Sequence, residues 1–156
     1  MIQRIQTVFL LLAIVSLGLF LWLPLIRFQD ISGSRDITGW QVSHLFNGYI
    51  YFINAILTAT AIGLSLINIF LFKNRSLQAL LCWFAIIFIA AGGGYVFYEY
   101  HSWPCGYNVF IHTIINCDVY FRKWNILPVL AIVFEILAFV YIRKDEALIE
   151  SMDRLR

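Results

Sequence analysis

Four long apolar runs constrain the fold of this chain more than any other feature. Each is long enough to cross the hydrocarbon core of a bilayer, which takes about 20 residues of helix. The predicted spans cover residues 7–26, 49–72, 77–98 and 124–142. Only 13% of the residues are charged, whereas about a quarter are charged in soluble domains. We therefore predict one integral membrane domain over residues 1–156, an all-α membrane protein built as a four-transmembrane-helix bundle.

The distribution of basic residues predicts the orientation of these spans. With the amino terminus inside, the cytoplasmic segments hold seven Lys and Arg residues and the outer loops hold four. Cytoplasmic loops carry the excess of basic residues in membrane proteins. We expect both termini in the cytoplasm, outer loops at 27–48 and 99–123, and a cytoplasmic tail at 143–156.

The first outer loop carries a turn signal. Ser32, Gly33 and Ser34 separate "LIRFQDI" from "DITGWQV", two short segments with β-branched and aromatic residues. This pattern is typical of a hairpin. The loop could hold a short β-hairpin at the membrane surface.

The second outer loop holds two cysteines, Cys105 and Cys117. Thiols on the outer face of a membrane tend to oxidise. A disulfide here would close a loop of roughly 13 residues and stabilise it by about 3 kcal/mol. We favour a structural disulfide that closes a lid over the outer helix ends. The remaining cysteine, Cys82, lies inside the third span and is expected to be a small buried hydrophobe.

The second outer loop has two alternative uses. His101, Cys105, His112 and Cys117 could supply four zinc ligands, but their spacing matches no zinc signature. A quinone-linked thiol oxidoreductase using Cys105 and Cys117 would relay electrons between two cysteine pairs. The first outer loop contains no cysteine, so only one pair is possible there. No metal and no cofactor are expected.

Small residues predict where the helices pack closely. Ala55, Ala59 and Gly63 recur every four residues and so share one face of the second span. Small residues on one face let another helix approach in a membrane. The third span contains three adjacent glycines, Gly92, Gly93 and Gly94, which predict a close crossing or a bend.

One acidic residue lies deep inside a span. Glu135 precedes Arg143 by eight positions, which puts it roughly 12 Å inside the cytoplasmic edge. Desolvation favours the neutral acid, which can donate a hydrogen bond. At the same depth Ser65 is the best acceptor, and Asn68 is a further polar residue inside the membrane. Such acids are functional suspects, so two uses stay open: structural or partner binding, and proton or lipid handling.

The tail continues the fourth span with apolar residues at helical spacing. Leu148, Met152 and Leu155 predict an amphipathic extension that docks on a partner or on the membrane surface. Its four basic and four acidic residues cancel. It therefore lacks the basic stripe that binds nucleic acid or anionic lipid.

The two ends of the chain, "MIQRIQTVFLLLA" and "RKDEALIESMDRLR", closely resemble those of an uncharacterised family. This is a domain-of-unknown-function family of small inner-membrane proteins from Gram-negative bacteria. The resemblance implies a four-span layout and the bacterial inner membrane. It implies no activity and no catalytic residues.

The function is predicted mainly from the surfaces that this layout presents to other molecules. The sequence contains no Walker loop, nucleophile elbow, metalloprotease helix or Rossmann fingerprint. We expect a non-enzymatic accessory or scaffolding subunit that contacts the lipid bilayer and a membrane-protein partner, without nucleic acid. The alternatives are a small proton- or lipid-handling protein using Glu135, and the thiol oxidoreductase.

Overall fold

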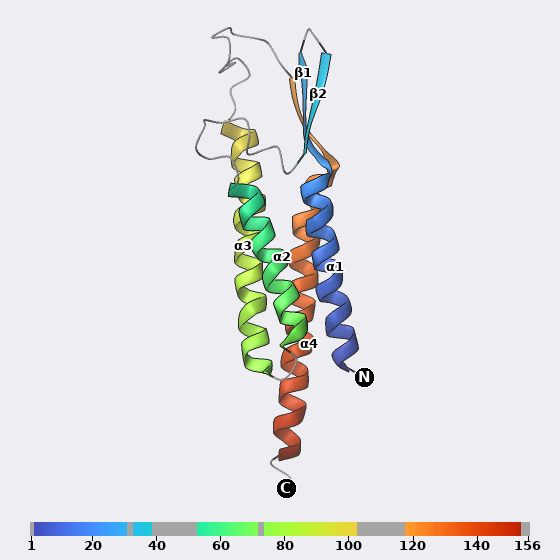
Figure 1. The fold of residues 1–156 in the computed structure, drawn as a ribbon, viewed down its shortest axis with the longest axis vertical. Helices are drawn as coiled ribbons and strands as arrows, with labels where there is room; N and C mark the ends of the chain where they lie inside the picture. Colours follow the sequence, from blue (N-terminus) through green and yellow to red (C-terminus); the bar gives the residue numbers. More distant parts are fainter. Residues whose placement is uncertain (1, 31–32, 39–52, 72–73, 103–117, 154–156) are drawn as a thin grey trace.

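The computed structural model describes residues 2–30, 33–38, 53–71, 74–102 and 118–153. In these residues the chain forms four long helices that stand side by side (Figure 1). They are α1 (Ile2–Trp22), α2 (Ile53–Phe70), α3 (Arg75–Ser102) and α4 (Leu127–Asp153), the last preceded by a 3-10 turn, η2 (Lys123–Ile126). Helix α1 packs on α2 and α4, and α3 packs on the same two helices. The helices therefore form a closed ring in which α2 and α4 lie diagonally.

Each predicted span coincides with a helix that is long and apolar enough to cross a membrane. The helix ends differ from the predicted bounds. The first span was predicted to reach residue 26, but α1 ends at Trp22 and the next residues form a strand. Pro24 explains this difference, because proline lacks the N–H of a helix and disfavours the helical conformation of the residue before it.

A small sheet stands on one end of the bundle. Among the described residues its strands are β1 (Pro24–Asp30), β2 (Gly33–Thr38) and β3 (Asp118–Phe121), all antiparallel, in the order β2-β1-β3. The first two strands lie where the sequence suggested a hairpin. The third strand was not predicted. It pairs with β1, so it links the segment between α3 and α4 to the segment between α1 and α2.

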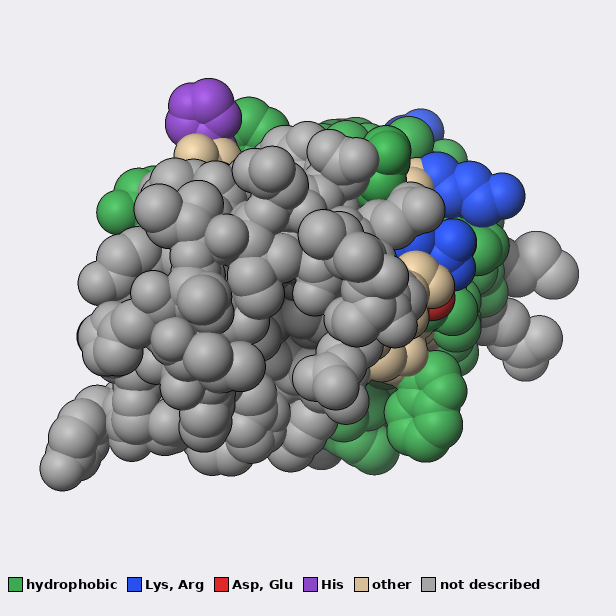
Figure 2. All heavy atoms as spheres, turned by 90° about the horizontal axis from the view of Figure 1, so that it is seen from above, with side chains coloured by type: hydrophobic (Ala, Val, Ile, Leu, Met, Phe, Trp, Pro, Cys, Tyr) green, Lys and Arg blue, Asp and Glu red, His purple; other side chains and the backbone are tan. Residues whose placement is uncertain are grey.

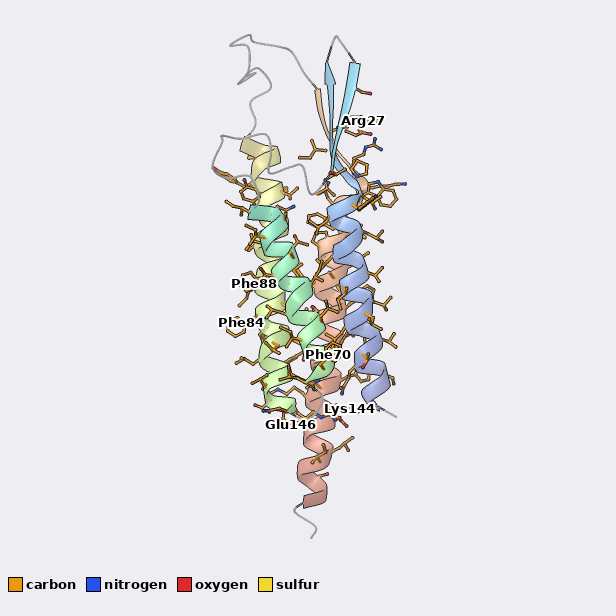
Figure 3. The ribbon with its side chains drawn as sticks, in the orientation of Figure 1. Arg27, Phe70, Phe84, Phe88, Lys144 and Glu146 are labelled. Carbon is orange, nitrogen blue, oxygen red and sulfur yellow. The ribbon has the colours of Figure 1, made fainter. Side chains whose placement is uncertain are left out.

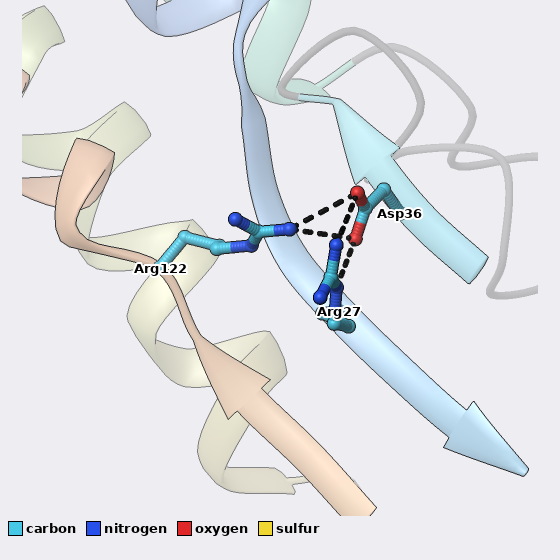
Figure 4. Close-up of polar contacts among 3 residues, drawn as sticks. All are labelled: Arg27, Asp36 and Arg122. Carbon is cyan, nitrogen blue, oxygen red and sulfur yellow. Dashed lines mark hydrogen bonds and ion pairs between the residues drawn. The ribbon is translucent and has the colours of Figure 1, made fainter. Parts of the chain in front are cut away.

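A carboxylate between two guanidinium groups joins β1 and β2 to Arg122, the residue that follows β3 (Figure 4). Asp36 on β2 accepts hydrogen bonds from Arg27 Nε at 2.7 Å and Nη2 at 3.1 Å, and from Arg122 Nη2 at 3.1 and 3.2 Å. The backbone N–H of Arg122 donates to the Leu25 carbonyl at 3.0 Å. The amide of Asn125 donates to the same carbonyl at 2.8 Å. These bonds anchor the start of α4 to β1.

Figure 2 views the molecule from the sheet end. Described Lys and Arg side chains gather at one edge of this view, and an acidic side chain lies beside them. Lys123, which begins η2, lies 5.0 Å from the centre of the Trp124 ring. Its ammonium group is placed for a cation–π contact.

The bundle is apolar on its outer faces. Exposed side chains include Val15, Ile56, Phe84 and Val133, one from each helix. Figure 3 shows Phe84 pointing away from the other helices. Helices that are apolar on the outside are typical of membrane spans, because lipid covers these faces.

The ion cluster at the sheet gives a pH prediction. Hydrogen bonding to Arg27, with a smaller contribution from Arg122, lowers the pKa of Asp36 from its ordinary value of 3.8 to about 2. A lowered pKa means that the stabilisation is complete above pH 3.8 and is lost as the pH falls through about 2. NMR titration of the Asp36 carboxyl should therefore show a low midpoint. Arg27→Gln should raise this midpoint more than Arg122→Gln does, and an ordinary midpoint in the unaltered protein would contradict the cluster.

Candidate functional site

The inner face of α2 is polar. Asn54, Thr58, Ser65 and Asn68 all point inward and are at most 2% exposed. Together with buried Ala61 they recur at intervals of four, three, four and three residues. This spacing keeps them on one stripe of the helix. An apolar exterior therefore surrounds a polar seam.

Glu135 on α4 meets this seam at Ser65. The Glu135 side chain is fully buried, and its Oε1 lies 2.5 Å from the Ser65 Oγ. The same Oγ lies 3.0 Å from the Ala61 carbonyl oxygen one turn earlier in α2. A serine hydroxyl has one hydrogen to donate. Both contacts are satisfied as separate two-centre hydrogen bonds when Ser65 donates to Ala61 and a protonated, neutral Glu135 donates to Ser65.

A second polar group joins α2 to α3 one turn closer to the chain termini. The Asn68 Nδ2 donates to the Gln78 carbonyl at 3.2 Å and lies 3.0 Å from the Cys82 Sγ. In return the Gln78 Nε2 donates to the backbone carbonyl of Asn68 at 2.9 Å. The Cys82 thiol also interacts with the carboxyl group of Glu135. The polar side chains of three helices therefore meet around this thiol.

Three buried oxygen atoms of this cluster have no hydrogen-bond partner among the described residues. They are the Asn68 Oδ1, the Gln78 Oε1 and the Glu135 Oε2. Buried polar atoms are otherwise nearly always paired. The Asn68 and Gln78 oxygens can accept from a small donor that enters the bundle, whereas the Glu135 carboxyl already has the Cys82 thiol beside it.

The seam ends in a charged pair near the terminal end of the bundle. Arg75 Nη2 lies 2.8 Å from Asp145 Oδ2, and Arg75 Nη1 donates to Gln6 Oε1 at 3.2 Å. The Gln6 Nε2 donates to the Tyr141 carbonyl at 3.1 Å. The side chains of Arg75 and Asp145 are 12% and 14% exposed, so the pair reaches the surface.

The glycines of α3 mark a close crossing. A Cβ on Gly92 would lie 3.3 Å from the Asn54 Oδ1 and 3.4 Å from the Thr58 Oγ1. A Cβ on Gly93 would lie 3.3 Å from Pro128, whereas one on Gly94 would meet nothing within 4 Å. Helix α3 runs without interruption through all three. Gly92 and Gly93 therefore bring α3 close to α2 and α4.

The small residues predicted to pack on α2 have a different environment. Ala55 is buried, but Ala59 is exposed and a Cβ on Gly63 would meet nothing within 4 Å. The bundle is closed through the polar stripe and not through this face. Packing of Ala59 and Gly63 against another chain stays a prediction.

Other predicted residues lie outside the described part of the chain. These are Cys105 and Cys117, His112 and Leu155, and the side chain of Met152 is likewise not described. The disulfide therefore stays a prediction. Among the described residues, no group of three or more His, Cys, Asp or Glu side chains could hold a metal ion.

Sequence reasoning missed part of the seam. It named Ser65 and Asn68 and did not use Thr58, Gln78 or Gln6. The heptad-like spacing of the polar residues on α2 was the available signal.

The hydrogen bond between Ser65 and Glu135 gives a stability prediction. Ser65→Ala leaves the buried carboxyl without its acceptor and should lower the free energy of unfolding by about 1–3 kcal/mol. Ser16→Ala is the matched control, because Ser16 is buried and bonds only to the Leu12 carbonyl of its own helix in the described residues. Glu135→Gln keeps a donor and should cost less than Glu135→Leu. Unfolding in detergent checks these values, and Ser65→Ala no more harmful than Ser16→Ala would contradict the assignment.

The comparison with known families agrees with the layout. The family model for "Domain of unknown function (DUF4293)" matches residues 2–155. No curated protein and no solved structure matches the chain. The predicted membership of an uncharacterised family is confirmed. The chain belongs to the DUF4293 family.

Proposed function

We propose that this chain is a multi-pass protein of the bacterial inner membrane that acts as a non-enzymatic accessory or scaffolding subunit of a membrane complex. Four helices that are long and apolar enough to cross a membrane support the first part. The long α4, with exposed apolar side chains near its end, supports the second. Asn68 with Gln78, and Arg75 with Asp145, hold the helices of the chain itself together.

The proposed orientation places both termini in the cytoplasm. The two chain ends lie at the same end of the bundle, opposite the sheet (Figure 1). The excess of basic residues at the terminal end favours the cytoplasm for that end. The sheet would then face the outer side.

The observation that carries the partner-binding proposal is the projection of α4. This helix continues to Asp153, beyond the ends of the other helices (Figure 1). Lys144 and Glu146 lie where α4 leaves the bundle (Figure 3). Leu148 and Ile149 follow and are 45% and 42% exposed. Apolar side chains on a charged helix outside the bundle are suited to burial against another protein.

The expected partner is a membrane protein with an apolar groove at its cytoplasmic edge. An amphipathic helix binds such a groove through residues spaced by three or four positions. Leu148, Met152 and Leu155 have this spacing. The tail has no net charge, so attraction to an anionic surface is not expected to contribute much.

The tail prediction uses a triple variant. Changing Leu148, Met152 and Leu155 to serine should leave membrane insertion intact, because no predicted span is altered. It should reduce copurification of the partner after mild detergent extraction, because the apolar contact is lost. Ala147→Ser, at an exposed position of the same segment, is the control. Unchanged copurification of the triple variant would remove the tail from the interface.

A further inference from the structure

We propose that Glu135 is a reversible proton-binding site that exchanges its proton only with the aqueous side on which the two termini lie. This inference is independent of the accessory role. It rests on the hydrogen-bond geometry of Ser65, on the unpartnered oxygens beside it, and on an apolar layer between the site and the sheet.

The geometry of Ser65 supports a proton on Glu135. Its hydroxyl contacts both the Ala61 carbonyl and the Glu135 carboxyl, and it has one hydrogen for these two acceptors. A protonated Glu135 satisfies both contacts. A neutral acid is also the form that a water-poor interior tolerates, because an isolated buried carboxylate is very costly.

The ionisable groups around Glu135 do not neutralise it. Helix α2 contains no ionisable side chain, and α1 contains only Arg4, near its start. Helix α3 contributes the Cys82 thiol, which is neutral when protonated. Arg75 of α3 is already paired with Asp145 of α4. A single bound proton therefore neutralises this carboxyl group.

A path for the proton leads toward the termini. The unpartnered oxygens of Asn68 and Gln78 lie on the terminal side of Ser65 and Cys82 along α2 and α3. Gln6 and the Arg75–Asp145 pair follow, and that pair is partly exposed. Buried polar oxygens without a protein donor bind water where there is room. Waters on these oxygens would link the carboxyl group to the terminal surface.

The path toward the sheet is blocked by an apolar layer. Each helix contributes one fully buried member of this layer, namely Leu17, Ala61, Ile89 and Ala131, and these four are at most 2% exposed. Ala61 and Ala131 each lie one turn from Ser65 and Glu135 on their helices, on the sheet side. Thr58 and Asn54 lie beyond the layer. They therefore cannot relay the proton of Glu135 without crossing it.

Ser65 reorients its hydroxyl when Glu135 releases the proton. The O–H bond of Glu135 breaks and the proton passes to water on the terminal side. The Ser65 hydroxyl then turns its hydrogen from the Ala61 carbonyl to the Glu135 Oε1, so that the carboxylate keeps one donor. Uptake reverses both changes. The carboxyl group thus has a hydrogen-bond partner in either state.

The test follows hydrogen–deuterium exchange at Glu135 in the full-length protein. Infrared spectra in vesicles should contain a carboxylic C=O band that shifts in heavy water and is missing in Glu135→Gln. Gln78→Met and Asn68→Leu remove polar groups on the terminal side with little change in volume. Each should slow the shift by about tenfold, the rate change that corresponds to the loss of one hydrogen bond of roughly 1.4 kcal/mol. Thr58→Val, a matched change beyond the apolar layer, should leave the rate unchanged.

Three results would overturn the proposal. They are the lack of a protonated carboxyl band that depends on Glu135, slowing by Thr58→Val equal to that by the terminal-side variants, and no slowing by either terminal-side variant. If Asn68→Leu does not fold by circular dichroism, Gln78→Met alone decides the last point.

Discussion

The contact between Glu135 and Ser65 is the interaction on which the interior of the bundle depends. It joins α4 to α2, which lie diagonally in the ring of helices, so it fixes the centre and not only one side. In water such a contact would contribute little, because each group would bond to solvent equally well. In a membrane the same groups have no solvent, so they must find each other. The polar stripe of α2 and the neutral state proposed for Glu135 both follow from this constraint.

The two ends of the bundle are held by charge and its middle by neutral contacts. At the sheet end Asp36 lies between Arg27 and Arg122, and at the terminal end Arg75 lies against Asp145. The interior between them contains neutral amides, hydroxyls, one thiol and one acid. Charged pairs are expected where water or headgroups can solvate them. When an ion pair is completely buried, the desolvation penalty can exceed the attraction between its charges.

The sequence predicted those features that depend on long runs or on depth in the membrane. Four apolar runs gave four helices, and counting equal depth along the spans placed Ser65 at the level of Glu135, where the structure has their bond. It did not predict β3, because four residues that pair with a strand about 90 positions earlier leave no local pattern. Nor did it find the stripe of α2, since single polar residues disappear in an average over an apolar run. On α2 the small residues at intervals of four did not mark the face that packs inside the bundle, whereas the polar residues at intervals of four and three did.

The central claim is that the bundle crosses a membrane with the sheet on one side and both termini on the other. Single cysteines at Gly33→Cys on β2 and at Asn74→Cys between α2 and α3, in a chain whose native cysteines are replaced, test it most directly. A reagent that cannot cross membranes should label the Gly33 position in intact cells stripped of their outer membrane. It should label the Asn74 position only after the membrane is opened. Labelling of Asn74→Cys in intact membranes, or equal labelling of both positions, would contradict the account.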